Sequence, residues 1–321
     1  MKKVIETTVI LAAWNAEATL ARSVGSALAQ AGPEVEAIVV DDASRDGTGE
    51  LARGIAVADP RARVLRLEEN RGPAAARNRA LAEARGEWVA VLDADDALAP
   101  GRLAATAAFA RARGADVVLD NLARVDPAGA PLDARPYLAG PDGDAAARWD
   151  LERFLSGNRF RPGERSLGYL KPTFRRAFLV EHGLAYDETL RNSEDFHLIA
   201  ECLVRGASLW FRPEPGYLYT VRPGSISHRL APQDAAALLQ AEAEFDRRHG
   251  PTLSKKARRL LRRRREAVAD LASAEAAMTA LKARRFGAAL AALLDRPKAI
   301  RRFGRQFAEA VGKRLTPAGS A

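Results

Sequence analysis

The stretch that decides the fold is WVAVLDADD, residues 88–96, in which an apolar run ends in a cluster of carboxylates. The first five residues are apolar without alternation, which is typical of a short strand buried on both faces of a parallel sheet. Ligands of open parallel sheets bind beyond the carboxyl ends of the strands. Asp93, Asp95 and Asp96 therefore stand where a binding site is expected.

The same pattern recurs through the first 120 residues. Apolar runs alternate with alanine-rich stretches of helical period, such as the one in which Leu20, Val24 and Leu28 fall four apart. Strands that alternate with helices predict βαβ units, and so an α/β protein whose mostly parallel, Rossmann-like central sheet is flanked by helices. The predicted strands are 8–12, 37–40, 64–67, 89–92 and 117–119.

Beyond residue 120 the pattern changes. Residues 126–144 are rich in Pro, Gly and Ala and are predicted to form loops, and from residue 233 the chain becomes helical and basic. We expect a domain at 1–230, with halves at 1–120 and 121–230, and a basic helical C-terminal extension at 231–321.

The charge is unevenly distributed. Residues 251–321 hold 18 Lys/Arg and 5 Asp/Glu, a net charge of +13, which leaves −4 for the rest of a chain whose total is +9. A basic tail on an acidic body indicates an anionic partner surface, and the alternative is a solvated helical face. Nucleic acid is not expected, because the tail lacks interleaved aromatic residues and a recognised reading motif.

Compartment signals are few. The single cysteine, Cys202, excludes an intramolecular disulfide and fits a reducing cytoplasm. No apolar run reaches the roughly 18 residues of a spanning helix, so none is expected. The short apolar run at residues 9–13 is not a convincing signal peptide.

Acidic residues follow two of the predicted strands. Asp41 and Asp42 come after the second strand, and Asp93, Asp95 and Asp96 come after the fourth. Clustered carboxylates repel one another, and a bound cation relieves the repulsion. Mn²⁺ or Mg²⁺ prefers such oxygen ligands and shares them with substrate phosphates. The alternative is that acids after a strand are ordinary turn and cap residues.

Four blocks of sequence resemble the inverting glycosyltransferases of family 2, which have the GT-A fold. The resemblance covers residues 5–230, and Trp14 stands where many members have Tyr. Residues 168–172 (GYLKP) and 183–187 (GLAYD) are most similar to glucosyltransferases of bacterial exopolysaccharide assembly, such as those of succinoglycan. The four blocks are residues 9–17 (VILAAWNAE), 38–48 (IVVDDASRDGT), 70–78 (NRGPAAARN) and 93–96 (DADD).

The resemblance implies that residues 1–120 bind the nucleotide of a UDP-sugar and that 121–230 bind the acceptor. The nucleotide pocket would be lined by Ala13, Trp14 and Asn15. Asp42 would accept a hydrogen bond from uracil N3–H, and Arg77 would lie near the donor.

The resemblance also implies a set of metal and phosphate ligands. Asp93 would meet the ribose or the metal, and Asp95 would bind the metal directly. Arg222 offers a planar fork for diphosphate oxygens. His228 could bind the metal or a phosphate, against the alternative of a structural or exposed histidine. For Lys171 a solvated surface position is favoured over a ligand contact, as it is for Arg175.

The second half should supply the catalytic base. An amphipathic helix is predicted after Ser193, which is the expected N-cap, so that Glu194 and Asp195 fall in its first turn. Acids there complement the helix dipole in any case. Because the family has an acidic pair at this place, the resemblance assigns the base to Asp195, with Glu194 as the alternative.

The resemblance as a whole implies a metal-dependent, inverting hexosyltransferase. It would move glucose or a related hexose from a UDP-sugar to a hydroxyl of a growing, lipid-linked oligosaccharide or polysaccharide. The basic run at 255–265 would hold a cytoplasmic enzyme at the anionic inner face of the cell membrane. One alternative is a sugar-nucleotide nucleotidyltransferase, which residues 14–17 disfavour because they are not a glycine-rich basic loop. Another is a catalytically inactive GT-A scaffold at the membrane.

Overall fold

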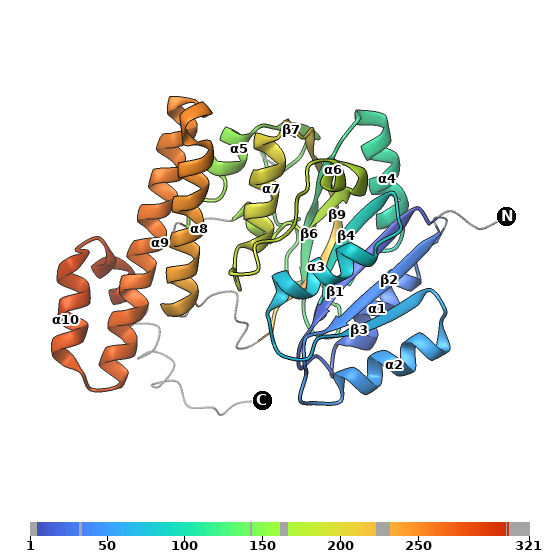
Figure 1. Ribbon diagram of the computed structural model, residues 1–321, viewed down its shortest axis with the longest axis horizontal. Coiled ribbons are helices and arrows are strands. Elements are labelled where there is room, and N and C mark those ends of the chain that lie inside the picture. Colours follow the sequence, from blue (N-terminus) through green and yellow to red (C-terminus); the bar gives the residue numbers. More distant parts are fainter. Residues whose placement is uncertain are drawn as a thin grey trace. The chain divides into compact units, whose positions relative to one another are not determined.

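The computed structural model describes residues 5–31, 34–141, 143–160, 166–222, 232–305 and 307 (Figure 1). The chain forms two compact units. The first comprises Met1–Gly157 and Leu167–Gly224, and the second comprises Asn158–Ser166 and Ser225–Ala321. The short segment that begins at Asn158 belongs to the second unit although it lies in the middle of the expected first domain.

The first unit is built on one sheet, with strand order β3-β2-β1-β4-β8-β6-β9-β5 and with β7 paired to β9. The strands β3, β2, β1 and β4 are mutually parallel, as the βαβ pattern predicts. Strand β8 then runs antiparallel to both β4 and β6, so the parallel character resumes only between β6 and β9. The strands are β1 (Thr7–Ala13), β2 (Val35–Asp41), β3 (Ala62–Arg66), β4 (Trp88–Asp93), β5 (Ala97–Leu98), β6 (Val117–Val125), β7 (Ala147–Trp149), β8 (Pro172–Arg175) and β9 (Leu209–Thr220).

Helices cover both faces of the parallel part of this sheet. The connections from β1 to β2 and from β2 to β3 step in one direction, and the connection from β3 to β4 steps back. Right-handed crossovers therefore place α1 and α2 on one face and α3 on the other. The helices of this unit are α1 (Leu20–Leu28), α2 (Thr48–Ala58), α3 (Pro73–Glu83), α4 (Arg102–Arg113), α5 (Leu151–Ser156), α6 (Arg176–Glu181) and α7 (Glu194–Val204).

Burial confirms the predicted core. Strand β4 is completely buried from Val89 to Leu92, as a strand covered on both faces must be. Leu20 and Val24 turn the predicted face of α1 inward. In the sheet, Ala13 pairs with Asp41 and Ala12 pairs with Asp93, so the carboxyl ends of β1, β2 and β4 lie level. The acids that follow β2 and β4 thus share one edge.

From residue 232 on, the described part of the second unit is mainly helical, as the sequence predicts. It contains α8 (Pro232–His249), α9 (Lys255–Lys282) and α10 (Phe286–Asp295), and α9 packs against both of the others (Figure 1). Ser254 caps α9, because its hydroxyl accepts a 3.0 Å hydrogen bond from the N–H of Ala257. Among the helices described, none has the length and apolar character needed to cross a membrane.

Candidate active site

Hydrogen bonds join the loops that follow the carboxyl ends of β1 and β2. The backbone N–H of Asn15 donates to the Ser44 hydroxyl at 3.0 Å, and the side-chain Oδ1 of Asn15 accepts from the N–H of Arg45 at 2.9 Å. Asn15 and Ala43 both adopt left-handed backbone conformations, with φ of 48° and 55°. Such conformations cost free energy and concentrate at binding sites. Beside them Ala13 is buried, whereas half of Trp14 is exposed.

The carboxylate of Asp42 is buried and fixes the loop that enters α3. It accepts hydrogen bonds from the backbone N–H groups of Arg71 at 2.7 Å and Gly72 at 2.8 Å, and from the side-chain amide of Asn70 at 2.9 Å. Gly72 has a φ of +91°, and a Cβ there would lie 3.2 Å from Cγ of Arg191, so glycine is needed. A contact between Asp42 and uracil stays a prediction.

Arg77 joins the two halves of the first unit. It projects from α3, which has Pro73 in its first turn, and it is 3% exposed. Its Nη2 lies 2.7 Å from Oδ1 of Asp93, and its Nη1 lies 2.5 Å from Oε1 of Glu194 and 3.3 Å from Oδ1 of Asp195. Glu194 and Asp195, the two candidates for the catalytic base, therefore contact the same guanidinium as Asp93 of the DADD segment.

Lys171 is a second cation of this cluster, and the expectation that it lies on a solvated surface is wrong. Its buried Nζ is 2.8 Å from Oδ2 of Asp93 and 3.1 Å from Oδ2 of Asp195. The cause is β8, which runs antiparallel to β4 with Thr173 opposite Ala90, so its first residues lie beside the carboxyl end of β4. Arg175, at the other end of β8, instead pairs with Asp116.

These contacts favour the charged forms of Asp93 and Lys171. Burial opposes the charged form of Asp93, but Lys171 and Arg77 outweigh it and lower the pKa of Asp93 to about 2. Burial also opposes the charge on Lys171, yet the carboxylates of Asp93 and Asp195 raise the pKa of Lys171 above its ordinary value. Three carboxylates, those of Asp93, Glu194 and Asp195, thus face two fixed cations.

Helix α7 positions the predicted base. It begins at Glu194 after Ser193, as expected, but the Ser193 hydroxyl does not cap it and donates instead to the side chain of Asn192. The left-handed conformation of Ser193, with a φ of 64°, turns the chain into the helix. Glu194 and Asp195 then face Arg77 in a buried position, with exposures of 7% and 4%. No described contact tests which of the two accepts a proton.

Asp93, Asp95 and Asp96 form a candidate cation site. Each offers a carboxylate oxygen, and these oxygens lie within 4.8 Å of one another. Asp96 is buried, and it accepts hydrogen bonds from the hydroxyl of Tyr217 and the N–H of Thr220, both at 2.7 Å. Burial and the charges of Asp93 and Asp95 raise the pKa of Asp96 to about 8.

The donor set fits a hard divalent cation. Oxygen ligands are those that Mg²⁺ and Mn²⁺ prefer, and a bound cation would relieve the repulsion among the three grouped carboxylates. Asp95 is partly exposed, and the guanidinium of Arg222 pairs with it. A positive group thus already lies against this carboxylate. His228 lies outside the described residues.

Tyr217 is a site residue that the sequence did not single out. Its hydroxyl donates to Asp96 and also accepts the backbone N–H of Asp93 at 3.1 Å, so it links both acids to β9. Burial, followed by the charges of Asp96 and Asp93, raises the pKa of Tyr217 well above its ordinary value, which keeps this donor protonated. Its only signal in the sequence is that it begins YLYTV, residues 217–221, a run of aromatic and β-branched residues typical of a strand.

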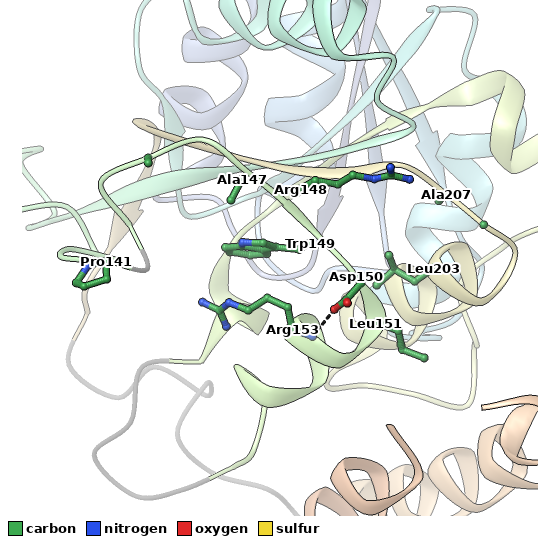
Figure 2. A pocket seen from close by; sticks show the side chains of 11 residues that line it. Pro141, Ala147, Arg148, Trp149, Asp150, Leu151, Arg153, Leu203 and Ala207 are labelled. Carbon is green, nitrogen blue, oxygen red and sulfur yellow. Dashed lines mark hydrogen bonds between the residues drawn. The ribbon is translucent and has the colours of Figure 1, made fainter. Parts of the chain in front are cut away.

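A separate cavity of about 760 Å³ opens beside β7 and the first turn of α5 (Figure 2). Its wall includes the ring of Trp149, which lies between Phe211 and the guanidinium of Arg153. The one acid among its lining residues, Asp150, caps α5 by accepting the N–H of Arg153 at 2.7 Å. This cavity has no cluster of acids, so the candidate chemistry lies at the carboxyl ends of the strands.

The sequence is similar to those of known proteins. A family profile described as "Glycosyl transferase family 2" matches residues 8–159. The succinoglycan biosynthesis proteins ExoO and ExoU of Rhizobium meliloti (strain 1021) are each 38% identical to this chain, and the alignments cover 93% and 91% of it and 84% of each relative. The chain therefore belongs to glycosyltransferase family 2.

Solved structures confirm the fold. S. aureus TarS in complex with UDP-GlcNAc aligns with a TM-score of 0.60 at 20% identity and covers 89% of both chains. The mannosyltransferase PcManGT from Pyrobaculum calidifontis, in complex with GDP-Man and Mn²⁺, aligns with a TM-score of 0.57 at 19% identity, covering 97% of this chain and 81% of that one. At these identities the likeness establishes a GT-A fold.

Proposed function

We propose that this glycosyltransferase moves a hexose from a UDP-sugar to a hydroxyl of a growing, lipid-linked polysaccharide, with inversion at the anomeric carbon. One observation carries the proposal. The carboxylate of Asp93 belongs to the candidate cation site. It also contacts Lys171 and Arg77, the two basic side chains that contact Asp195. In this proposal the site for the leaving diphosphate and the base for the acceptor are neighbours.

The relatives support the choice of donor and acceptor. ExoO and ExoU are named for succinoglycan biosynthesis, and TarS was solved with UDP-GlcNAc. WfaP of Escherichia coli, 38% identical over 91 residues, is named as a β-1,3-glucosyltransferase that uses UDP-Glc and a diphosphoundecaprenol-linked acceptor. A UDP-hexose donor and a lipid-linked acceptor follow as the proposal for this chain.

The reaction is a single displacement. Asp195 accepts the proton of the acceptor hydroxyl as that oxygen bonds to the anomeric carbon, and the bond from this carbon to the UDP oxygen breaks. One base is sufficient, because no covalent sugar–enzyme intermediate forms. Lys171 and Arg77 orient the base, and Arg222 contacts the diphosphate. Mn²⁺ or Mg²⁺, held by Asp95 with Asp93, would supply positive charge for the leaving group.

A screen of UDP-sugars tests this function through release of UDP. We expect release with Mn²⁺ or Mg²⁺ that stops in EDTA and falls more than about 10-fold in Asp95→Ala, since that substitution removes a metal ligand. Release that survives both treatments would contradict the metal site. Binding of UDP without turnover of any UDP-sugar would favour an inactive scaffold.

The assignment of the base has its own test. Asp195→Asn should still bind UDP but lose sugar transfer, and Glu194→Gln is the matched variant, because both side chains contact Arg77. We expect the larger loss of kcat in Asp195→Asn, by about 100-fold or more. A larger loss in Glu194→Gln would move the base to Glu194.

We further propose that the enzyme works peripherally at the anionic inner face of the cell membrane. The basic run at 255–265 lies on α9, which exposes Arg258, Arg259, Arg262 and Arg263 and buries Arg264. Each exposed cation near anionic lipid contributes about 1 kcal/mol of attraction. Arg258→Glu with Arg262→Glu should therefore weaken sedimentation with anionic vesicles, and unchanged sedimentation would refute this attachment.

A further inference from the structure

An apolar stripe runs along the exposed side of α10. Phe286, Leu290 and Leu294 follow one another at intervals of four residues, and their exposed fractions are 66%, 58% and 67%. Residues four apart share one face of a helix. Ala289 is the buried residue of this helix, and α10 packs against α9. The three side chains of the stripe are thus exposed to solvent, whereas Leu293 on the same helix is partly buried.

Exposed apolar residues are concentrated in this region. Among the described residues nine large hydrophobic side chains are exposed, and five of them lie between positions 286 and 307. Single exposed apolar residues are normal, whereas a contiguous group marks an interaction surface. Ile300 and Phe307, which follow α10 in the chain, are the other two exposed residues of this five.

Basic residues flank the stripe at both ends. Residues 282–305 contain eight Lys/Arg and one acid, Asp295, a net charge of +7. Lys282, Arg284 and Arg285 are exposed before α10, and Lys298 and Arg301 are exposed after it. An apolar helix face bordered by cations is the pattern of a helix that lies in the interface of an anionic bilayer. Two copies of the surface would oppose like charges, so charge complementarity favours lipid over a second chain.

We propose that α10 inserts the stripe of Phe286, Leu290 and Leu294 into the headgroup and acyl boundary of an anionic membrane, while the flanking cations contact lipid phosphates. This rests on the peripheral attachment proposed above and adds an apolar anchor to it. Attraction by α9 alone would vanish at high salt, because exposed charges are screened. An inserted stripe retains part of the binding there, because transfer of apolar surface does not depend on charge.

A local probe tests the insertion directly. The chain has one cysteine, Cys202, which is buried, so an introduced cysteine can be labelled selectively. Leu290→Cys with an environment-sensitive fluorophore should show a blue shift and a gain in intensity when vesicles of phosphatidylglycerol and phosphatidylcholine are added. The matched control is Val57→Cys on α2, which is 89% exposed in the first unit. No shift at position 290, or an equal shift at both positions, overturns the proposal.

Partition of the full chain provides the second test. Phe286→Ser with Leu294→Ser should weaken binding to the anionic vesicles by about 100-fold. Each substitution removes an apolar side chain that would insert into the bilayer, which costs about 10-fold in affinity. The loss should persist at high salt, and UDP release without vesicles should be unchanged, which separates a failure of the anchor from a failure of the enzyme. Unchanged partition overturns the proposal. So does a change in oligomeric mass without a change in vesicle binding, which would assign the stripe to self-association.

Discussion

The ammonium group of Lys171 lies 3.1 Å from Oδ2 of Asp195 and so holds the predicted catalytic base. The same nitrogen lies 2.8 Å from Oδ2 of Asp93, the first acid of the cation cluster. A buried lysine therefore bridges the two chemical parts of the site. Because removal of one partner from a buried ionic network leaves the others uncompensated, Lys171 is the residue on which the geometry of the base depends.

Lys171→Met should destabilise the first unit and slow transfer. The substitution leaves Asp93, Glu194 and Asp195 with one cation, Arg77, and we expect a loss of about 3–5 kcal/mol in the free energy of unfolding. Urea unfolding followed by tryptophan fluorescence measures it, since all four tryptophans lie in the first unit. The control Lys171→Arg keeps the charge and should lose less. Equal stability of the two variants would show that the ion pairs do not hold the cluster.

The local part of this architecture could be predicted from sequence. Apolar runs such as Val89–Leu92 and the helix face of Leu20 and Val24 predict which residues of a single strand or helix are buried. The structure buries these residues. The acids that follow β4 were predicted as ligands because strand ends in parallel sheets are binding edges. Arg77 and Asp195 were singled out through the family motif, and the structure joins them through one 3.3 Å contact.

What could not be predicted depends on pairing between distant segments. Lys171 enters the site because β8 is inserted, antiparallel, between β4 and β6, and no periodicity in the residues around it specifies those neighbours. The segment that begins at Asn158 joins the second unit for a similar reason. The backbone carbonyl of Asn158 accepts a 2.6 Å hydrogen bond from the side chain of Arg264, which lies more than a hundred residues further along the chain.

Asp96 should make the metal-free protein less stable as pH rises. Its pKa is raised from 3.8 to about 8, so the folded protein holds a proton that the unfolded chain releases. The contribution of this bound proton to the free energy of unfolding is complete below pH 3.8 and is lost by about pH 8. In EDTA, Asp96→Asn should therefore gain stability relative to the wild type between these limits, measured by urea unfolding at a series of pH values. A difference that does not change with pH would contradict the burial of this charge.

Asp42→Asn tests the loop that leads into α3. The amide that replaces one carboxylate oxygen cannot accept both backbone N–H groups, those of Arg71 and Gly72. An unsatisfied buried donor costs about 1–3 kcal/mol, so the free energy of unfolding should fall by this amount. We also expect KM for the UDP-sugar to rise with a smaller change in kcat, because the loop borders the edge at which the nucleotide is proposed to bind. A normal KM in a destabilised variant would limit Asp42 to a structural role.

The second unit contains a buried ion pair whose loss should open its helices. Nε of Arg264 lies 2.7 Å from Oε1 of Glu242, and both side chains are 2% exposed. Glu242→Met leaves a buried guanidinium without its carboxylate and should cost about 3–5 kcal/mol. Glu244→Met removes the partner of the exposed Arg247 and should change the stability little, because solvent screens this surface pair.

Amide hydrogen exchange in α8 and α9 measures both changes, because no tryptophan lies in the second unit. Faster exchange is expected in Glu242→Met and little change in Glu244→Met. Adding Arg264→Leu to Glu242→Met removes the unpaired charge as well as its partner. Replacing both members of a buried pair by apolar residues is often neutral, so the double variant should recover most of the protection. A double variant that exchanges faster than Glu242→Met would show that Arg264 stabilises the helices through its hydrogen bond to Asn158 rather than through the pair.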